Sequence, residues 1–210
     1  MTKEQKKFYQ IKTTSDYNVV GLDVDYKIIV DDKEEQVILQ YEESDSNTDW
    51  WNNFLFIPWP LKLDNKTVWT TLGYARAYKS TENQPLSEFI MTVLAHPDYK
   101  ACIRGWSFGS AMAKITARHF NIRISKEIDE LVTFGDVKCF VNPFKKPYCK
   151  RIREYYTIND FIGCVCIPFF HGDNKGRCKV GPKFNLFSQL FKSEYYHTHY
   201  EEYDYSKWEE

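Results

Sequence analysis

The 210-residue chain lacks any stretch that approaches the roughly 20 apolar residues of a membrane-spanning helix. Its first seven residues are mostly polar or charged and no apolar segment follows, so we expect no secretory signal peptide. We therefore expect a soluble, cytoplasmic or otherwise intracellular protein, with lysis or a non-classical route as its way out of the cell. The net charge is only −1, from 28 Lys and Arg against 29 Asp and Glu, which argues against a nucleic-acid partner.

Without a secretory signal, the six cysteines are expected to be free thiols. Cys164 and Cys166 lie near His171 and Cys178, a set that invites comparison with a zinc site. The C-x-C spacing differs from that of standard zinc knuckles, and the residues between the cysteines and the histidine are apolar. We therefore expect neither a metal nor an organic cofactor.

Internal repeats and low-complexity linkers are also missing, and 43% apolar residues suffice for one packed core. We expect a single domain over residues 1–210. Apolar patterns predict strands at residues 17–30, 37–41, 101–103, 131–135 and 155–158. The first two ranges would form a hairpin or two adjacent strands. Apolar patterns also predict helices at residues 67–80, 84–96 and 110–120. Alternating strands and helices indicate an α/β fold with a mostly parallel sheet, whose sites lie at the carboxyl ends of the strands.

The most informative motif is G-x-S-x-G, at Gly105–Trp106–Ser107–Phe108–Gly109. A predicted strand precedes it and a predicted helix rich in small residues follows, which is the context of a nucleophile elbow. A tight strand-to-helix turn holds a serine hydroxyl exposed at the start of the helix, where the dipole favours developing negative charge. Ser107 is therefore the candidate nucleophile, and the N–H of Phe108 is a candidate oxyanion donor.

A serine nucleophile needs a base and an acid, which in this fold follow it along the chain in the order acid, then histidine. Asp160 ends a predicted strand and is the candidate acid. His171 follows it too closely for the usual strand and loop. His197 and His199 both lie on a predicted late loop, and we favour His197 while leaving His199 open.

Several motifs in sequence order then resemble the class 3 lipase family of α/β hydrolases. They lie between about residues 35 and 205 and comprise Tyr41–Glu42–Glu43–Ser44 with Asp49–Trp50, Thr71–Leu72–Gly73–Tyr74, the elbow, Val132–Thr133–Phe134–Gly135, Asn159–Asp160 and Tyr196–His197. The resemblance implies a reduced α/β-hydrolase fold. It implies that Ser44 is a second oxyanion-hole residue and that residues 46–56 form a lid. The lid and substrate-binding residues would be Trp50, Trp51, Phe54, Leu55, Phe56 and Trp106.

The resemblance implies a serine carboxylic-ester hydrolase that acts on lipid esters, as a triacylglycerol lipase or a phospholipase A. Its partner would be the lipid ester, met at a membrane or lipid-droplet surface, and the sequence leaves the oligomeric state open. Two departures matter, because Trp106 replaces the family histidine and Glu42–Glu43 replaces an Arg-Gly pair. They keep two alternatives open, namely a non-catalytic lipid- or protein-binding relative and another serine acyl hydrolase such as a thioesterase or peptidase.

Overall fold

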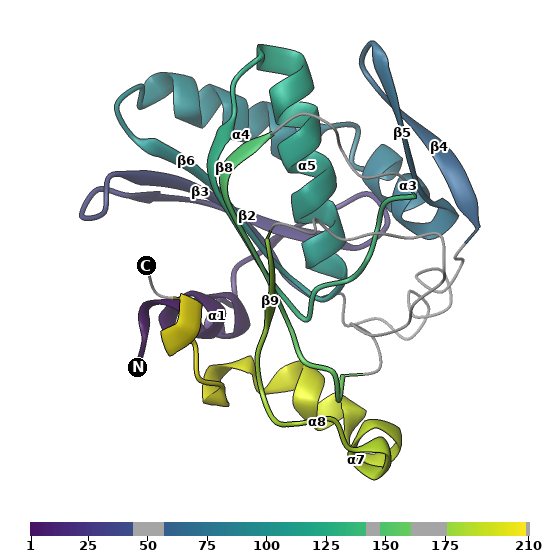
Figure 1. The fold of residues 1–210 in the computed structure, drawn as a ribbon. Coiled ribbons are helices and arrows are strands. Elements are labelled where there is room, and N and C mark those ends of the chain that lie inside the picture. The colour runs from purple at the N-terminus through teal and green to yellow at the C-terminus, as the bar shows by residue number, and fades with distance from the viewer. Residues whose placement is uncertain (44–56, 142–147, 161–175, 209–210) are drawn as a thin grey trace.

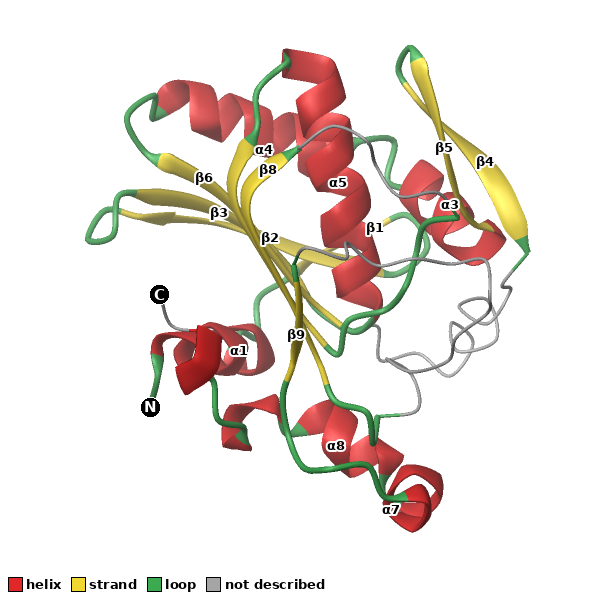
Figure 2. Cartoon of the chain, viewed as in Figure 1, coloured by secondary structure: helices red, strands yellow, loops and turns green. Residues whose placement is uncertain are grey.

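The computed structural model describes residues 1–43, 57–141, 148–160 and 176–208. A seven-stranded sheet forms its centre (Figures 1 and 2). The strands lie in the order β1 (Asn18–Val20), β2 (Val24–Asp31), β3 (Gln36–Tyr41), β6 (Lys100–Trp106), β7 (Ile128–Phe134), β8 (Cys149–Tyr156) and β9 (Arg177–Lys179). The strands β1, β2 and β3 pair antiparallel, whereas β3, β6, β7, β8 and β9 pair parallel. The expected mostly parallel sheet is therefore confirmed.

Helices cover both faces of this sheet. One face carries α3 (Leu72–Ser80), α4 (Gln84–Ala95) and the long α5 (Phe108–Ile124), whereas α1 (Lys3–Thr13) lies on the other (Figure 1). Leu131 and Val132, neighbours in β7, belong to these two different cores, as strand alternation requires. Such double coverage explains why every residue of β3 is buried and why its middle is the apolar run Val37–Ile38–Leu39.

The sequence patterns assigned no element to the N-terminus, yet α1 forms there. Thr2 and Gln5 make a capping box, in which the Thr2 hydroxyl accepts from the Gln5 N–H and the Gln5 side chain accepts from the Thr2 N–H. The helix buries Phe8 against Trp106 and Phe134, with ring centroids 5.3 and 5.2 Å away. Tertiary packing of one apolar face thus holds a helix whose remaining residues are mostly polar.

The prediction of one helix over residues 67–80 was wrong in its first part. Residues up to Thr71 form β5 (Lys66–Thr71), which pairs antiparallel with β4 (Pro58–Leu63) in a separate two-stranded sheet. Val68, Trp69 and Thr70 are β-branched or aromatic, and such side chains favour strands. The helix α3 begins only after Thr71, whose hydroxyl accepts from the Tyr74 N–H as its N-cap.

The C-terminal segment is helical rather than the predicted loop. It contains α7 (Leu186–Phe191) and α8 (Ser193–Thr198), followed by the short 3₁₀ helices η1 (Tyr200–Glu202) and η2 (Ser206–Trp208). Tyr200 and Tyr205 are fully buried and pack with Phe134 against the same face of the sheet as α1. No helix in the described residues is long and apolar enough to cross a membrane.

A buried ion cluster fastens α5 to the sheet. The Lys114 ammonium contacts Asp136 Oδ1 at 2.7 Å and Glu154 Oε1 at 3.6 Å, and it donates to the carbonyl of Val137. Burial alone would lower the pKa of Lys114, but the two carboxylates outweigh it and raise that pKa above its usual value. Lys114 therefore stays charged and ties the helix to the loop that follows β7.

We predict that Lys114→Met lowers the free energy of unfolding by about 3–5 kcal/mol, because two buried carboxylates lose their counter-charge. Urea titration followed by circular dichroism measures this change. Lys150→Met is the matched control, since Lys150 makes a surface pair with Asp129 and is 63% exposed. It should change the free energy far less, and similar losses in the two variants would contradict the role of the buried cluster.

Candidate active site

The elbow places Ser107 between the end of β6 and the start of α5. Its backbone has φ 55° and ψ −121°, a conformation that residues other than glycine rarely adopt. The Ser107 N–H donates to the carbonyl of Phe134 at 3.0 Å, and the Ser107 carbonyl accepts from the Ser110 N–H at 2.9 Å. Backbone bonds on both sides thus hold the strained turn, as expected of a nucleophile elbow.

Both glycines of the motif are required by close backbone contacts. A Cβ on Gly105 would lie 2.3 Å from the carbonyl oxygen of Gly109. A Cβ on Gly109 would lie 2.5 Å from the carbonyl oxygen of Glu42, which follows β3. Only glycine fits at both positions, because the turn from β6 into α5 is tight and the chain after β3 lies against the first turn of α5.

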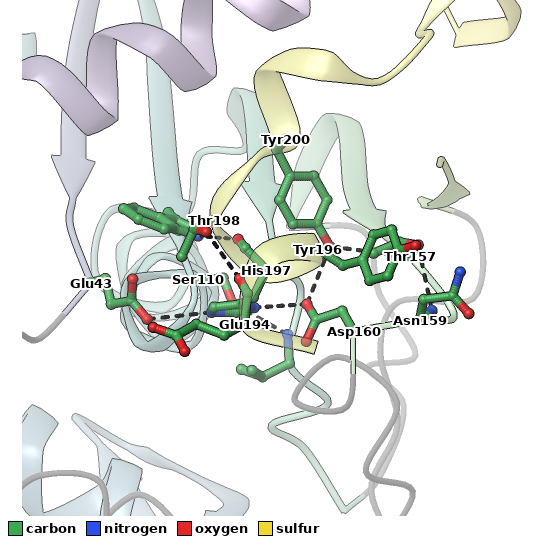
Figure 3. Close-up of polar contacts among 12 residues, drawn as sticks. Glu43, Ser110, Thr157, Asn159, Asp160, Glu194, Tyr196, His197, Thr198 and Tyr200 are labelled. Atoms are coloured by element: carbon green, nitrogen blue, oxygen red, sulfur yellow. Dashed lines mark hydrogen bonds and ion pairs between the residues drawn. The ribbon is translucent and has the colours of Figure 1, made fainter. Parts of the chain in front are cut away.

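The structure brings Asp160 and His197 together. Asp160 Oδ2 lies 2.7 Å from His197 Nδ1, and both side chains are buried (Figure 3). Tyr200 supports the pair, because its hydroxyl donates to Asp160 Oδ2 at 3.4 Å and accepts from the Thr157 N–H at 3.1 Å. This carboxylate orients the imidazole through Nδ1 and leaves Nε2 for another partner.

His197 lies in α8 and is held from two more sides. The Trp106 indole N–H donates to the His197 carbonyl at 3.1 Å. Gly135 has φ +55°, and a Cβ there would lie 2.7 Å from His197 Cε1. Gly135 follows Phe134, whose carbonyl binds the Ser107 N–H. The turn after β7 therefore contacts both the serine and the histidine segments.

Trp106 has a different contact from the one expected of a substrate-binding residue. Its side chain is buried, and its ring packs edge-on against Phe8 of α1 and near the His197 ring. A large ring that follows Gly105 in the last position of β6 points into the core beneath the site. Trp106 thus supports the backbone of His197 from the core side, through its indole N–H.

The second histidine left open by the sequence lies apart from this pair. His199 Nδ1 lies 2.9 Å from the carbonyl of Tyr195 and 2.9 Å from the hydroxyl of Thr198. Its ring stacks on Tyr195 with centroids 4.1 Å apart. The geometry thus joins His197, and not His199, to Asp160, while the catalytic role of His197 stays a prediction.

A third charged group, Glu43, contacts His197. Glu43 Oε1 lies 3.4 Å from His197 Nε2, on the side of the ring opposite Asp160 (Figure 3). Burial alone would lower the pKa of His197, but Asp160 and Glu43 outweigh it and raise that pKa from 6.5 to about 10. His197 is therefore an imidazolium at neutral pH in this conformation. Because the folded pKa lies above 6.5, this charge pairing stabilises the fold below pH 6.5 and is lost as pH rises toward 10.

Sequence reasoning treated Glu43 only as a departure from a family motif. Nothing in the spacing of the motifs could place its carboxylate on His197, because β3 and α8 meet only in the folded chain.

Ser107 also differs from expectation, since it retains only 6% exposure and is almost covered in this conformation. Phe108 is the first residue of α5, where no helical hydrogen bond uses the N–H.

Several predicted residues lie outside the described part of the chain. These are the second oxyanion residue Ser44, the lid at residues 46–56 with Trp50, Trp51, Phe54, Leu55 and Phe56, and the candidate zinc ligands Cys164, Cys166 and His171. Cys102, Cys139, Cys149 and Cys178 are described, and all four are buried free thiols.

The family model for lipase (class 3) matches residues 39–165, which is more than half of the chain. The chain belongs to the class 3 lipase family. The matched range contains the elbow and Asp160, whereas the candidate base His197 lies beyond it. The chain matches none of the curated proteins with which it was compared.

Solved lipase structures share its fold. A Rhizomucor miehei lipase in complex with its propeptide is 18% identical with a TM-score of 0.61, over 75% of this chain and 53% of that one. A triacylglycerol lipase whose catalytic centre is a serine-protease triad is 16% identical with a TM-score of 0.59, over 74% and 62%. A Yarrowia lipolytica lipase is 17% identical with a TM-score of 0.55, over 78% and 64%. The expected α/β-hydrolase fold is confirmed, in a chain that spans between half and two thirds of each lipase's length.

We predict that Glu43→Gln lowers the pKa of His197 by about 1–2, because one of the two carboxylates that stabilise the imidazolium is removed. Titration of the histidine side chains by NMR measures it, with the His197 signal assigned by its loss in His197→Ala. Glu194→Gln is the matched control, since Glu194 is an exposed carboxylate in the same helix α8. An equal shift in both variants would mean that general surface charge, rather than the Glu43 contact, sets the pKa.

Proposed function

We propose that this protein is a serine ester hydrolase that cleaves lipid esters through Ser107, His197 and Asp160. The observation that carries the proposal is the buried 2.7 Å pair between Asp160 and His197, held by the same turn that binds the elbow. A histidine oriented by an acid, with its segment on the same turn as a strained serine, is the arrangement expected to activate a weak hydroxyl nucleophile. Both this geometry and the family membership therefore support esterase activity.

In the proposed reaction, His197 begins as a neutral base and Ser107 Oγ attacks the ester carbonyl carbon. His197 Nε2 takes the hydroxyl proton, while Asp160 stabilises the imidazolium that forms. The tetrahedral intermediate collapses to an acyl-enzyme, and His197 returns the proton to the departing alcohol oxygen. A water molecule then attacks the acyl-enzyme, giving its proton to His197, which passes it to Ser107 as the fatty acid leaves.

The oxyanion of each tetrahedral intermediate would be held by two N–H groups, those of Phe108 and Ser44. Phe108 begins the 17-residue helix α5, so its N–H lies at the positive end of the helix dipole. Ser44 is carried over from the family motif, directly after Glu43. Loss of one such donor would raise the barrier by about 2.7–4 kcal/mol.

The substrate class rests on relatives rather than on a bound ligand. The family is that of class 3 lipases, and one structural neighbour is described as a triacylglycerol lipase. We carry a lipid ester over to this chain, either a triacylglycerol or a phospholipid. Residues 46–56, with five apolar or aromatic side chains, would cover the ester as a lid.

Glu43 favours a second candidate, a non-catalytic relative that keeps the fold for binding. A carboxylate at His197 Nε2 engages the nitrogen that would take the proton of Ser107. In an active enzyme this contact breaks before the serine is deprotonated. A fluorophosphonate probe separates the two candidates, because it labels only an activated serine in folded protein.

Hydrolysis of p-nitrophenyl acyl esters tests the nucleophile. We predict that Ser107→Ala lowers kcat by roughly 10⁴-fold or more and abolishes fluorophosphonate labelling, because the attacking oxygen is gone. Ser110→Ala is the matched control, since Ser110 lies in the first turn of α5 and its hydroxyl accepts from the Val137 N–H instead. Equal rates for wild type and Ser107→Ala would refute the assignment.

The Glu43 contact makes a separate prediction about pH. Glu43→Gln should move the acid limb of kcat/KM to lower pH and raise the rate at pH 7 by roughly tenfold, because more His197 is neutral there. A pH–rate profile on a short-chain ester measures it, with Glu194→Gln as the control. A uniform loss of rate at every pH would show instead that Glu43 aids substrate binding.

A further inference from the structure

The short helix α7 is built with its apolar side outward. Leu186, Phe187, Leu190 and Phe191 are each at least 60% exposed, and Phe184 just before the helix is 56% exposed. Phe187 and Phe191 contact each other with ring centroids 4.7 Å apart, so these side chains form one patch. Contiguous exposed apolar patches are uncommon on monomeric proteins and mark contact surfaces.

The side of α7 opposite these apolar residues is held against the protein, with Ser188 and Gln189 half-buried there. Gln189 donates to the carbonyl of Ile158 at 3.1 Å, and the Asn185 N–H donates to the side chain of Asn159 at 2.9 Å. Asn159 also donates to the carbonyl of Lys183 at 3.0 Å. These bonds fix which side of α7 points outward. The orientation is therefore the reverse of an ordinary surface helix, which buries its apolar side.

The charged residues of this segment itself have one sign. From Lys179 to Lys192 the sequence contains three lysines, at positions 179, 183 and 192, and neither Asp nor Glu. All three lysines are exposed. An apolar face flanked by lysines is typical of segments that lie in the interface of a membrane with anionic lipids.

The patch adjoins the candidate active site. The helix α7 runs directly into α8, which carries His197, and its anchor Asn159 precedes Asp160. Both helices lie at one end of the molecule, away from α4 (Figure 1). A surface that binds α7 would therefore lie next to the end of the molecule that carries Asp160 and His197.

We propose that the apolar face of α7, with its flanking lysines, docks the protein onto an anionic lipid surface. The choice of a lipid surface over a second copy of the chain rests on charge and size. Two copies would bring six lysines together, and a six-residue helix cannot supply the roughly 800 Å² per partner of a stable protein interface. The preference for lipid over another protein rests in part on the proposed lipid-ester activity.

The test measures binding without turnover. Full-length protein with Ser107→Ala is floated with vesicles of phosphatidylcholine, with and without phosphatidylserine. We expect binding that phosphatidylserine strengthens, and we expect Phe187→Ser with Phe191→Ser to weaken it by about tenfold or more. Lys183→Glu with Lys192→Glu should remove the phosphatidylserine dependence.

The matched control replaces Met91 and Leu94 with serine, since these residues are 68% and 60% exposed on the distant helix α4. Equal loss of binding in the control, or none in the Phe187 and Phe191 variant, would overturn the proposal. So would light scattering that shows a dimer lost on changing the two phenylalanines. Turnover of a short-chain ester, measured with Ser107 intact, should stay unchanged in the α7 variants. If wild type bound vesicles normally but did not turn over the ester, the proposed enzymatic activity would be refuted and the proposed docking surface would stand.

Discussion

The candidate site depends on the close passage of the chain after β3 over the first turn of α5. Glycine at position 109 allows the Glu42 carbonyl to approach, and glycine at 105 allows the turn itself to close. Because Tyr41 pairs with Gly105 and Gly105 with Thr133, the ends of β3, β6 and β7 meet at one edge of the sheet. Three features of the site directly follow these strand ends: the strained Ser107, the turn at Gly135, and the segment that carries the carboxylate of Glu43.

Buried charge is the second organising feature, and it occurs in two neighbouring sets. Lys114 lies between two carboxylates and holds α5 to the loop after β7, while His197 lies between Asp160 and Glu43. The loop after β7 joins the sets, because it provides a carboxylate to the lysine and a close backbone contact to the histidine. In each set one cation compensates two acids in a low-dielectric interior, where an unpaired charge is costly. The histidine set is also tied to a functional state, since the proposed chemistry begins from a neutral imidazole.

The distribution of apolar surface links this site to its surroundings. Two cores fill the two faces of the sheet, and α1 and the C-terminal tyrosines close the second of them around Trp106. The helix α7 departs from that pattern, because its Gln189 side chain is bonded inward and its phenylalanines face outward. The same loop that orients Asp160 also anchors α7. The proposed contact with lipid and the proposed chemistry therefore share one structural support.

The sequence by itself determined the fold class and the elbow, because glycine spacing and apolar runs reflect local backbone constraints, and it supplied Asp160 as the candidate acid. It placed most strands of the sheet, but it misread residues 67–71 as helix and the segment around His197 as loop, since packing overrides weak local preference there. It left His197 and His199 open, and it could not show that Glu43 contacts His197 or that Trp106 supports that histidine. Those contacts join residues up to 154 positions apart, so only the tertiary structure decided them, through sheet register and the docking of α8.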